Sequence, residues 1–279
     1  MPSDEIDRRL RFAGRLLRRA GAIALRAYRA PSMAVESKGL QDPRTETDLE
    51  IEEFLRSRIG RAFPSDGFFC EEGGPSGLVD GENPTWVIDP IDGTANFARH
   101  IPHWCISIAL VRGEEIEFGL ILDPLDRELF KARRGRGSTL NGARLRVTGA
   151  HKLTEARVNV GFSYRRPPDL HLRGVRALLE SGCEYSRLAS GALGLAWVAC
   201  GRFDGYWEPH INSWDAAAGV LIANEAGART SRLLVRDGLR RGNPVLACAP
   251  GIEAELHALL DPIDEESDRL SFIAQTASP

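Results

Sequence analysis

The segment WVIDPIDGTANF, residues 86–97, decides how this chain is to be interpreted. Its apolar start is typical of a buried strand, and the Asp, Pro and Gly residues that follow favour a turn. Two carboxylates, Asp89 and Asp92, therefore stand where a strand ends. They can converge on a hard cation such as magnesium, which prefers oxygen ligands. Asp-Pro and Asp-Gly are also simple turn formers, so the segment alone leaves both explanations open.

The pattern around this segment predicts a mainly antiparallel sheet preceded by two helices. Apolar residues at helical spacing predict an amphipathic helix from Ser3 to Ala24 and a second one around residues 51–59, closed by Pro64, with Asp48 in its first turn. Short apolar runs separated by turn residues predict strands at residues 68–69, 86–88, 106–111 and 118–122. Downstream, a layered α/β half is predicted from a strand at 157–161 and helices at 170–181, 191–200 and 214–226.

Composition indicates an ordinary globular chain of 279 residues, 43% hydrophobic and 27% charged, with a net charge of −3. No run approaches the roughly 18 apolar residues of a membrane span, and the N-terminus lacks a secretory signal, so a soluble, cytoplasmic protein without membrane partners is expected. The net charge makes nucleic acid an unlikely partner. The six arginines among the first twenty residues are expected to form the solvent-facing side of the first helix.

The five cysteines are scattered and never form a C-x-x-C pair. Neither a disulfide framework nor a zinc site is predicted, and the cysteines are expected to be reduced and mostly buried. The segment after Asp264 is expected to be loose.

Two motifs give the chain a resemblance to a known family. The pattern W-x-x-D-P-x-D-G-T-x-N-F, followed by a proline and S-x-A, is met by residues 86–97, Pro102, Ser107 and Ala109. A second pattern, W-D-x-A-A-G followed by E-A-G, is met by residues 214–219 and 225–227. With both motifs in order, the chain resembles the inositol monophosphatases over nearly its whole length.

The resemblance implies a magnesium site in which Glu71, Asp89, Asp92, Asp215 and the backbone carbonyl of Ile91 hold up to three ions. Taken singly, Glu71 is also typical of a solvated acidic turn, and Asp215 of an acid at a helix start. Four carboxylates around one cavity raise each other's pKa unless cations neutralise them, which independently favours metal.

The same resemblance implies the residues that act on the substrate. Asp48 and Thr94 match the family's water-activating pair, although Asp48 is equally typical of an acid in a helix's first turn beside a threonine cap. Asp92, Gly93 and Thr94 are expected to contact the substrate, the last two offering backbone N–H groups to its phosphate. Glu208 matches a position that accepts hydrogen bonds from inositol hydroxyls, with a solvent-facing acid as the alternative. His100, His103 and His210 are expected at surface or loop positions.

For the whole chain, the resemblance implies an α-β-α-β-α sandwich of the sugar-phosphatase type, with residues 1–150 as an α+β part that carries most metal ligands and residues 151–279 as an α/β part that contacts substrate. The expected activity is magnesium-dependent phosphomonoester hydrolysis, with inositol 1-phosphate as the leading substrate and histidinol phosphate or another sugar or nucleotide phosphate as alternatives. A regulatory protein associated with transcription complexes is the alternative from another class. Homodimerisation and lithium sensitivity are further implications.

A few positions depart from the family's usual pattern and bear on substrate more than on chemistry. They are Arg44, Cys70, Ala228 and the stretch from Arg187 to Leu193. The shape of the pocket is therefore less predictable than the metal site.

Overall fold

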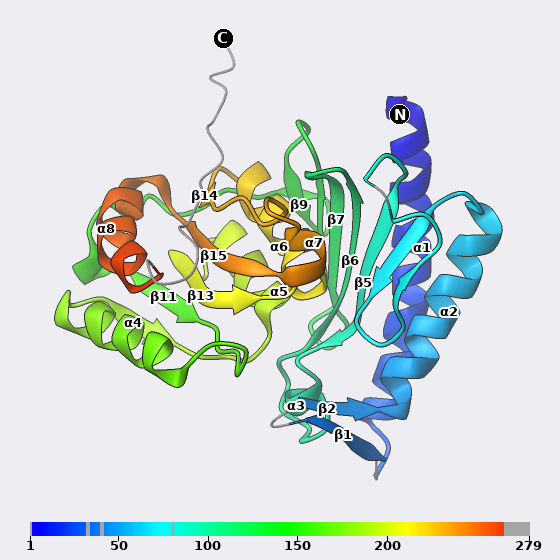
Figure 1. The fold of residues 1–279 in the computed structure, drawn as a ribbon, viewed down its shortest axis with the longest axis horizontal. Helices are drawn as coiled ribbons and strands as arrows, with labels where there is room; N and C mark the ends of the chain where they lie inside the picture. Colours follow the sequence, from blue (N-terminus) through cyan, green and yellow to red (C-terminus); the bar gives the residue numbers. More distant parts are fainter. Residues whose placement is uncertain (1, 32–33, 40–41, 80, 265–279) are drawn as a thin grey trace.

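The computed structural model describes residues 2–31, 34–39, 42–79 and 81–264. Its elements form successive layers of helix and sheet (Figure 1). Helices α1 (Ser3–Tyr28) and α2 (Glu46–Ala62) cover one face of an eight-stranded sheet, and α5 (Gly191–Ala199) and α6 (Ser213–Glu225) separate it from a five-stranded sheet. Helices α4 (Pro168–Glu180) and α8 (Glu253–Asp264) cover the outer face of that second sheet. The expected α-β-α-β-α sandwich is confirmed.

The eight-stranded sheet is almost wholly antiparallel, as predicted. Its strand order is β10-β9-β8-β7-β6-β5-β3-β4, and only β3 and β5 run parallel. The strands are β3 (Gly67–Cys70), β4 (Gly74–Ser76), β5 (Thr85–Asp92), β6 (Cys105–Arg112), β7 (Glu115–Asp123), β8 (Glu128–Arg133), β9 (Ser138–Leu140) and β10 (Ala143–Arg144). The strands β4 and β8 to β10 were not predicted, because their short or mixed sequences lack a clear apolar run.

The five-stranded sheet is mixed. Its order is β12-β11-β13-β15-β14, with β11 parallel to β12 and β13, and β15 antiparallel to β13 and β14. The strands are β11 (Arg157–Val160), β12 (Glu184–Ser186), β13 (Gly205–Ile211), β14 (Arg229–Thr230) and β15 (Asn243–Cys248). The predicted boundary near residue 150 falls between β10 and β11, and it stays a prediction.

The remaining elements connect the layers. They are a hairpin of β1 (Val35–Gly39) and β2 (Asp42–Thr45), the short helices α3 (Thr94–Phe97) and α7 (Gly238–Arg241), and the 3-10 turns η1 (Leu153–Glu155) and η2 (Pro250–Ile252). The hairpin was not predicted, since its polar sequence shows no alternation of apolar residues.

Strand β5 contributes alternate side chains to two cores. Trp86 and Ile88 are buried with apolar residues of α1 and α2, whereas Val87 is buried with those of α5 and α6. Because successive side chains of a strand point to opposite faces, Asp89 follows Val87 toward α5 and α6. The same alternation that buries the sheet therefore points the first acid of the motif toward the C-terminal half.

The expectation that all six N-terminal arginines face solvent is wrong for Arg9. Arg9 is 5% exposed, and its guanidinium donates two hydrogen bonds of 2.8 Å to the Asp66 carboxylate. Trp86 donates its indole N–H to the same carboxylate at 2.9 Å. A buried acid thus holds Arg9 against the sheet, whereas the other five arginines are exposed: Arg8, Arg11, Arg15, Arg18 and Arg19.

The cysteine expectation is confirmed, because all five cysteines are free and only Cys200 is not fully buried. No helix in the described part of the chain has the length and apolar character that crossing a membrane requires. The predicted loose segment after Asp264 lies outside the described residues.

Replacing Asp66 with alanine should lower the free energy of unfolding by about 3–5 kcal/mol, because it leaves the buried Arg9 guanidinium with only the partly exposed Glu5 carboxylate as its partner. Glu50→Ala is the matched control, since it removes the partner of Arg26 in a pair whose side chains are 72% and 53% exposed. That change should cost less than about 1 kcal/mol. Urea unfolding of both variants measures the difference, and equal losses would contradict the assigned role of Asp66.

Candidate functional site

The end of β5 brings Asp89 and Asp92 to the same cavity. The pairing of β5 with β6 shifts register between these two residues, so the strand bulges where the motif predicted a turn. Gly93 then adopts a left-handed φ of 93° before α3 begins. A Cβ at this position would lie 3.1 Å from the carbonyl oxygen of His103 and 3.3 Å from that of Ala189. Both the backbone angle and the tight space therefore favour glycine here.

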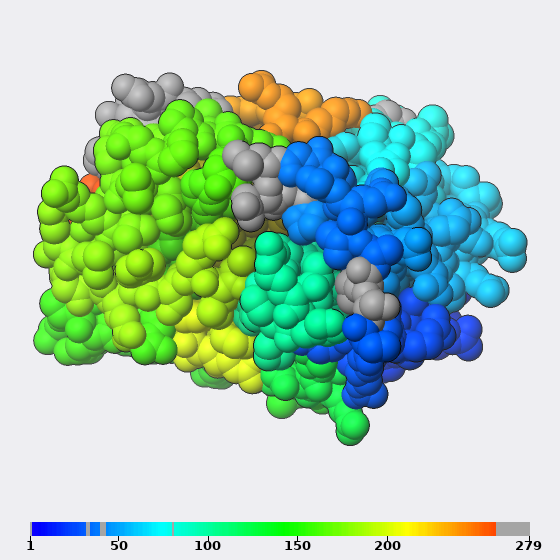
Figure 2. Space-filling view, turned by 90° about the horizontal axis from the view of Figure 1, so that it is seen from below, coloured from blue at the N-terminus to red at the C-terminus, as the bar shows by residue number. Residues whose placement is uncertain are grey.

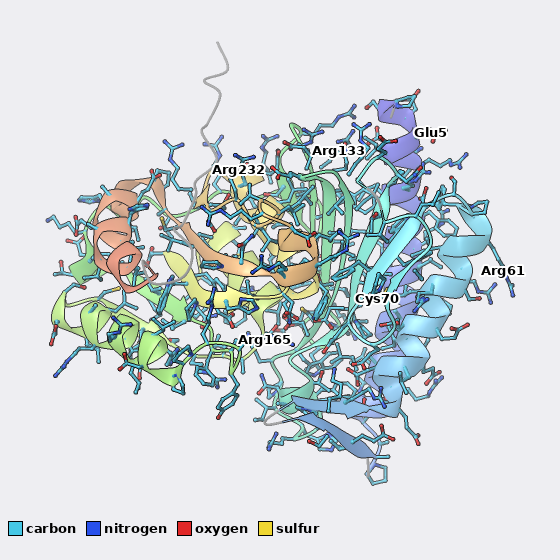
Figure 3. All side chains as sticks on the ribbon, in the orientation of Figure 1. Glu5, Arg61, Cys70, Arg133, Arg165 and Arg232 are labelled. Atoms are coloured by element: carbon cyan, nitrogen blue, oxygen red, sulfur yellow. The ribbon has the colours of Figure 1, made fainter. Side chains whose placement is uncertain are left out.

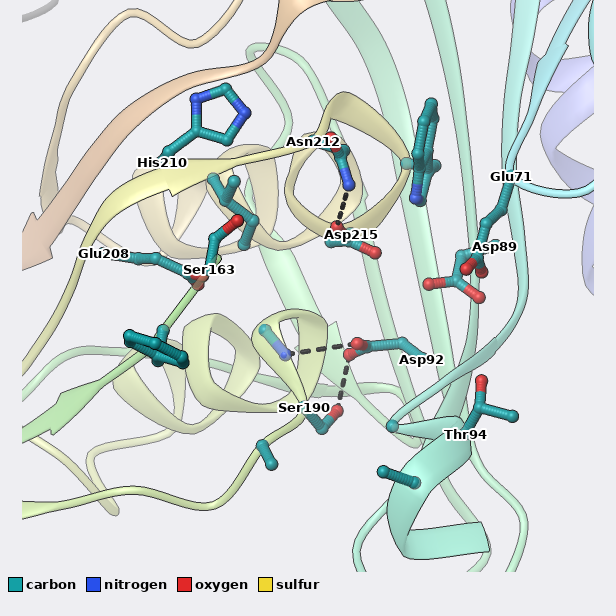
Figure 4. A pocket seen from close by; sticks show the side chains of 18 of the residues that line it. Glu71, Asp89, Asp92, Thr94, Ser163, Ser190, Glu208, His210, Asn212 and Asp215 are labelled. Carbon is teal, nitrogen blue, oxygen red and sulfur yellow. Dashed lines mark hydrogen bonds between the residues drawn. The ribbon is translucent and has the colours of Figure 1, made fainter. Parts of the chain in front are cut away.

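A third acid reaches this point from the other half of the chain. Asp215 lies in the first turn of α6, where the amide of Asn212 donates to its Oδ2 at 3.1 Å (Figure 4). One carboxylate oxygen from each of Asp89, Asp92 and Asp215 lies within 4.8 Å of the other two. The structure thus gathers three of the four predicted metal ligands into one cluster.

The fourth predicted ligand, Glu71, follows β3 and lines the same cavity. Its segment is held by α2, because the Glu52 carboxylate accepts hydrogen bonds from the N–H groups of Glu72 and Gly73. Lys38, on β1, places its ammonium 2.8 Å from both Glu71 and Glu72. A cation of the chain itself therefore already offsets part of the negative charge at this edge of the site.

The acids of the cluster are electrostatically costly to keep ionised. Burial, followed by repulsion from neighbouring carboxylates, raises the pKa of Asp89 and of Asp215 well above the ordinary value. Burial also raises the pKa of Glu71 to about 7, although Lys38 opposes this shift. A bound cation would remove this cost, because it favours the ionised form of every acid around it.

The donor set fits a divalent cation of the magnesium type. All of its side-chain donors are carboxylate oxygens, which hard cations prefer. Asp89 Oδ1 accepts the backbone N–H of Ile91 at 2.9 Å, but its buried Oδ2 has no hydrogen-bond partner in the described structure. Because buried polar atoms are nearly always paired, this oxygen is available to coordinate an ion.

Asp92 also ties the cluster to α5. Its Oδ2 accepts a hydrogen bond from the hydroxyl of Ser190 at 2.5 Å (Figure 4). The N–H of Ala192 donates to the same oxygen at 2.7 Å. These groups form the N-terminus of α5, where a negative charge is stabilised by the helix dipole. Burial raises the pKa of Asp92, and these hydrogen bonds oppose the increase.

Thr94 and Asp48 are adjacent, as the resemblance implied. The Thr94 hydroxyl lies 3.2 Å from Asp48 Oδ1 and 2.8 Å from the carbonyl oxygen of Ile91, and its single proton can go to only one of them. Asp48 Oδ2 accepts the backbone N–H of Thr45 at 2.8 Å and its hydroxyl at 2.5 Å. Asp48 is therefore the first-turn acid beside a threonine cap, and its role in activating water stays a prediction. Burial raises its pKa to about 6.

The four acids predicted as metal ligands, together with Lys38 and Thr94, line one cavity of about 620 Å³, whereas the buried Asp48 contacts Thr94 and does not line it. Its walls come from the β1–β2 hairpin, the end of β5, the segment after β11, the start of α5 and strand β13. Figure 2 shows the face on which the hairpin, in blue, and the segment after β5, in teal, meet the green C-terminal half. Both halves of the chain are therefore needed to form the cavity.

Glu208 lines the cavity from β13. It is 7% exposed, so the alternative of a solvent-facing acid is wrong. Its Oε2 accepts the hydroxyl of Tyr206 at 2.5 Å, and burial raises its pKa to about 7. A Cβ on Gly161 would lie 2.0 Å from this oxygen, so a glycine leaves room for the carboxylate.

The expectation of a surface or loop position holds for His100 and His103 and is wrong for His210. His100 is exposed, but His103, although on a loop, is 8% exposed and packs against Trp197. Burial lowers the pKa of His103 to about 4. His210 lies in strand β13, is 9% exposed and lines the cavity. The position of a histidine near a motif does not predict whether its side chain is buried, because burial depends on how the two halves of the chain pack together.

Several residues at the site were missed by sequence reasoning, among them Ser190, Lys38 and Tyr206. Ser190 carried a usable signal, since a serine before a small-residue helix is a typical N-cap. Lys38 lies in a polar stretch with no pattern, and Tyr206 differs from other buried aromatics only through its contact with Glu208. Those two contacts depend on the fold and have no local signature.

Without divalent cations, the free energy of unfolding should fall as the pH rises from 6.5 to about 8. The pKa of Glu71 is about 7 in the folded chain against an ordinary 4.5, and those of Asp89 and Asp215 are also raised, so the native state binds more protons than the unfolded chain there. His103, whose ordinary pKa is 6.5, opposes this trend only at lower pH. We expect the free energy of unfolding, measured with urea, to fall by at least about 1 kcal/mol over this pH interval.

Magnesium should remove most of this loss, because it binds the ionised carboxylates of the native state. Asp89→Asn should lack the magnesium effect and show a weaker pH dependence. A native protein whose stability rises over this pH interval, with or without magnesium, would contradict the cluster's electrostatics.

Comparisons with known proteins agree with this geometry. Residues 5–264 match the family model described as "Inositol monophosphatase family". The Nus factor SuhB of Pseudomonas aeruginosa is 38% identical over 228 residues, covering 80% of this chain and 84% of that protein. The inositol-1-monophosphatase of Caulobacter vibrioides is 36% identical over 222 residues, covering 77% and 86%. The crystal structure of extragenic suppressor protein suhB from Bartonella henselae matches with a TM-score of 0.81 at 31% identity, covering 89% of this chain and 96% of that one. The chain therefore belongs to the inositol monophosphatase family.

Proposed function

We propose that this protein is a magnesium-dependent phosphomonoester hydrolase that acts on a phosphorylated polyol, with inositol 1-phosphate as the leading candidate. The observation that carries the proposal is the cluster of Asp89, Asp92 and Asp215 in one cavity with Thr94, whose hydroxyl lies 3.2 Å from the buried Asp48. Histidinol phosphate and other sugar or nucleotide phosphates are alternatives that share the same chemistry. By family resemblance, the working unit is a homodimer.

In this proposal Glu71, Asp89, Asp92 and Asp215, with the carbonyl of Ile91, hold the magnesium. The fit rests on the all-oxygen donor set and on the unpaired Oδ2 of Asp89. Magnesium, when bound, supplies positive charge next to the phosphoryl oxygens and lowers the pKa of water. The ligands themselves fix where the phosphate lies relative to Thr94.

Thr94 and Asp48 would remove the proton from the attacking water. With Asp48 ionised, the Thr94 hydroxyl donates to Asp48 Oδ1, which leaves a lone pair of Thr94 to accept a hydrogen bond from water. The proton then passes through the hydroxyl to the carboxylate. A pKa of about 6 keeps Asp48 largely ionised at neutral pH while leaving it basic enough to act.

The phosphate and the polyol would be held by separate parts of the cavity. Backbone N–H groups at the first turn of α3, including that of Thr94, have no partner four residues earlier within the helix and can face a phosphate oxygen. Glu208 offers a buried carboxylate to the hydroxyls of the polyol. Tyr206 orients that carboxylate through its own hydroxyl.

Purified protein should release phosphate from inositol 1-phosphate only when Mg²⁺ is present. Asp89→Asn should reduce this rate at least about 100-fold by weakening metal binding, and Thr94→Ala should reduce it by about 100-fold or more by breaking the proton path. Asp123→Asn is a matched control, because Asp123 is a buried carboxylate that does not line the cavity. Phosphate release without magnesium, or full activity of Asp89→Asn, would contradict the proposed mechanism.

We propose a second role, binding to a transcription complex, on the basis of the outer face of α1. No acidic residue occurs between Arg8 and Val35, and seven arginines of this stretch are exposed: Arg8, Arg11, Arg15, Arg18, Arg19, Arg26 and Arg29. Their spacing of mostly three or four residues puts them on one side of the helix over about 30 Å. Several relatives carry the name Nus factor SuhB.

Changing Arg11, Arg15, Arg18 and Arg19 together to glutamine should weaken association with a transcription elongation complex by about tenfold or more at low salt. Phosphate release should stay unchanged, because α1 lies on the other side of the eight-stranded sheet from α5 and α6. Arg173→Gln with Arg176→Gln, two exposed arginines of α4, is the control for charge removal. Biolayer interferometry measures the affinity, and no binding by the native protein would remove this role.

A further inference from the structure

Two arginines line the part of the cavity away from the metal carboxylates. Arg165 belongs to the segment between β11 and α4, and Arg187 to the segment before α5. Figure 3 shows Arg165 on the segment that leads into α4, beside the opening between the two halves. Both side chains are largely exposed. The cavity is thus acidic at one end and basic at the other.

Neither arginine has its charge matched by the chain. In the described residues, no ion pair joins a carboxylate to either guanidinium, and among the exposed arginines without such a pair these two line the cavity. Arg187 instead lies over the ring of Phe162, 5.7 Å from its centre. The backbone N–H of Arg165 donates to the Ser163 hydroxyl, which fixes the turn that carries it. Both cations are therefore available to a ligand in the cavity.

Glu208 does not neutralise this basic end. Its carboxylate is buried and already accepts the hydroxyl of Tyr206. The fields of Arg187 and Arg165 favour its ionised form, yet burial still holds its pKa at about 7. Two full positive charges thus face at most one partly ionised carboxylate.

We infer that Arg165 and Arg187 form a subsite for a second phosphate group on the leaving alcohol. The inference rests on the proposed function, because it takes the reacting phosphate to lie at the acidic end. A guanidinium offers several N–H donors in a planar fork that matches phosphate oxygens. Glu208 contacts the hydroxyls between the two ends. The preferred substrate is then a polyol bisphosphate, and Arg165 is the residue that distinguishes it from the monophosphate.

The test compares two substrates that differ only in the second phosphate, inositol 1-phosphate and inositol 1,4-bisphosphate, each with Mg²⁺. The native protein should show a kcat/KM at least about tenfold higher on the bisphosphate, and added salt should shrink this advantage. Arg165→Gln should lower kcat/KM on the bisphosphate about tenfold, mainly through KM, and on the monophosphate less than about threefold. Arg165→Lys should restore part of the advantage, since it keeps the charge without the fork.

Arg173→Gln is the matched control, because it removes an exposed arginine of α4 that does not line the cavity. It should leave kcat/KM unchanged on both substrates. Equal kcat/KM of the native protein on both substrates would overturn the subsite and leave the proposed function standing. An equal loss on both substrates in Arg165→Gln would show a structural role for this residue and also overturn it. Hydrolysis of neither substrate would overturn the proposed function and the subsite together.

Discussion

The carboxylate of Asp92 is the interaction on which the rest of the site depends. It ends a strand of the first sheet, yet it accepts hydrogen bonds from Ser190 and Ala192 at the start of a helix that packs against both sheets. A buried charge held in this way is stable only while both halves keep their positions. The acidic cluster and the wall of the cavity are therefore set by the same contact, and a change at Asp92 would disturb both.

That contact also explains how the fold tolerates several acids in one place. Each acid of the cluster meets a different compensating group: the α5 N-terminus for Asp92, Lys38 for Glu71, and the amide of Asn212 for Asp215. Among the acids of the cluster, only Asp89 has a buried carboxylate oxygen without a hydrogen bond in the described structure. An unpaired buried oxygen at the centre of a repelling cluster is costly in a protein that only binds partners. The cluster therefore favours a metal-dependent activity over a purely structural or regulatory role.

The sequence predicted what depends on local pattern or on the family motifs. The long helices, the main strands and the convergence of Asp89, Asp92 and Asp215 were predictable, because periodicity and two motifs mark them. The burial of Arg9 was not predictable, because it depends on the ion pair with Asp66, which is distant in the sequence. The β1–β2 hairpin and the position of Lys38 were also missed, because a polar strand pair has no apolar alternation. What the sequence lacked in each case was the identity of a distant partner.

The architecture separates the chemistry of the site from its specificity. Residues that would act on the reacting phosphate come from β5, α2, α3 and α6 and from the segment after β3, which the packed layers of the fold hold in place. The basic end of the cavity comes from two connecting segments, around Arg165 and Arg187, which are largely exposed. Substitutions there alter the charge that meets the leaving alcohol without moving a metal ligand. The arginine face of α1 lies beyond the first sheet, so binding a partner there and hydrolysing a phosphate ester are compatible in one molecule.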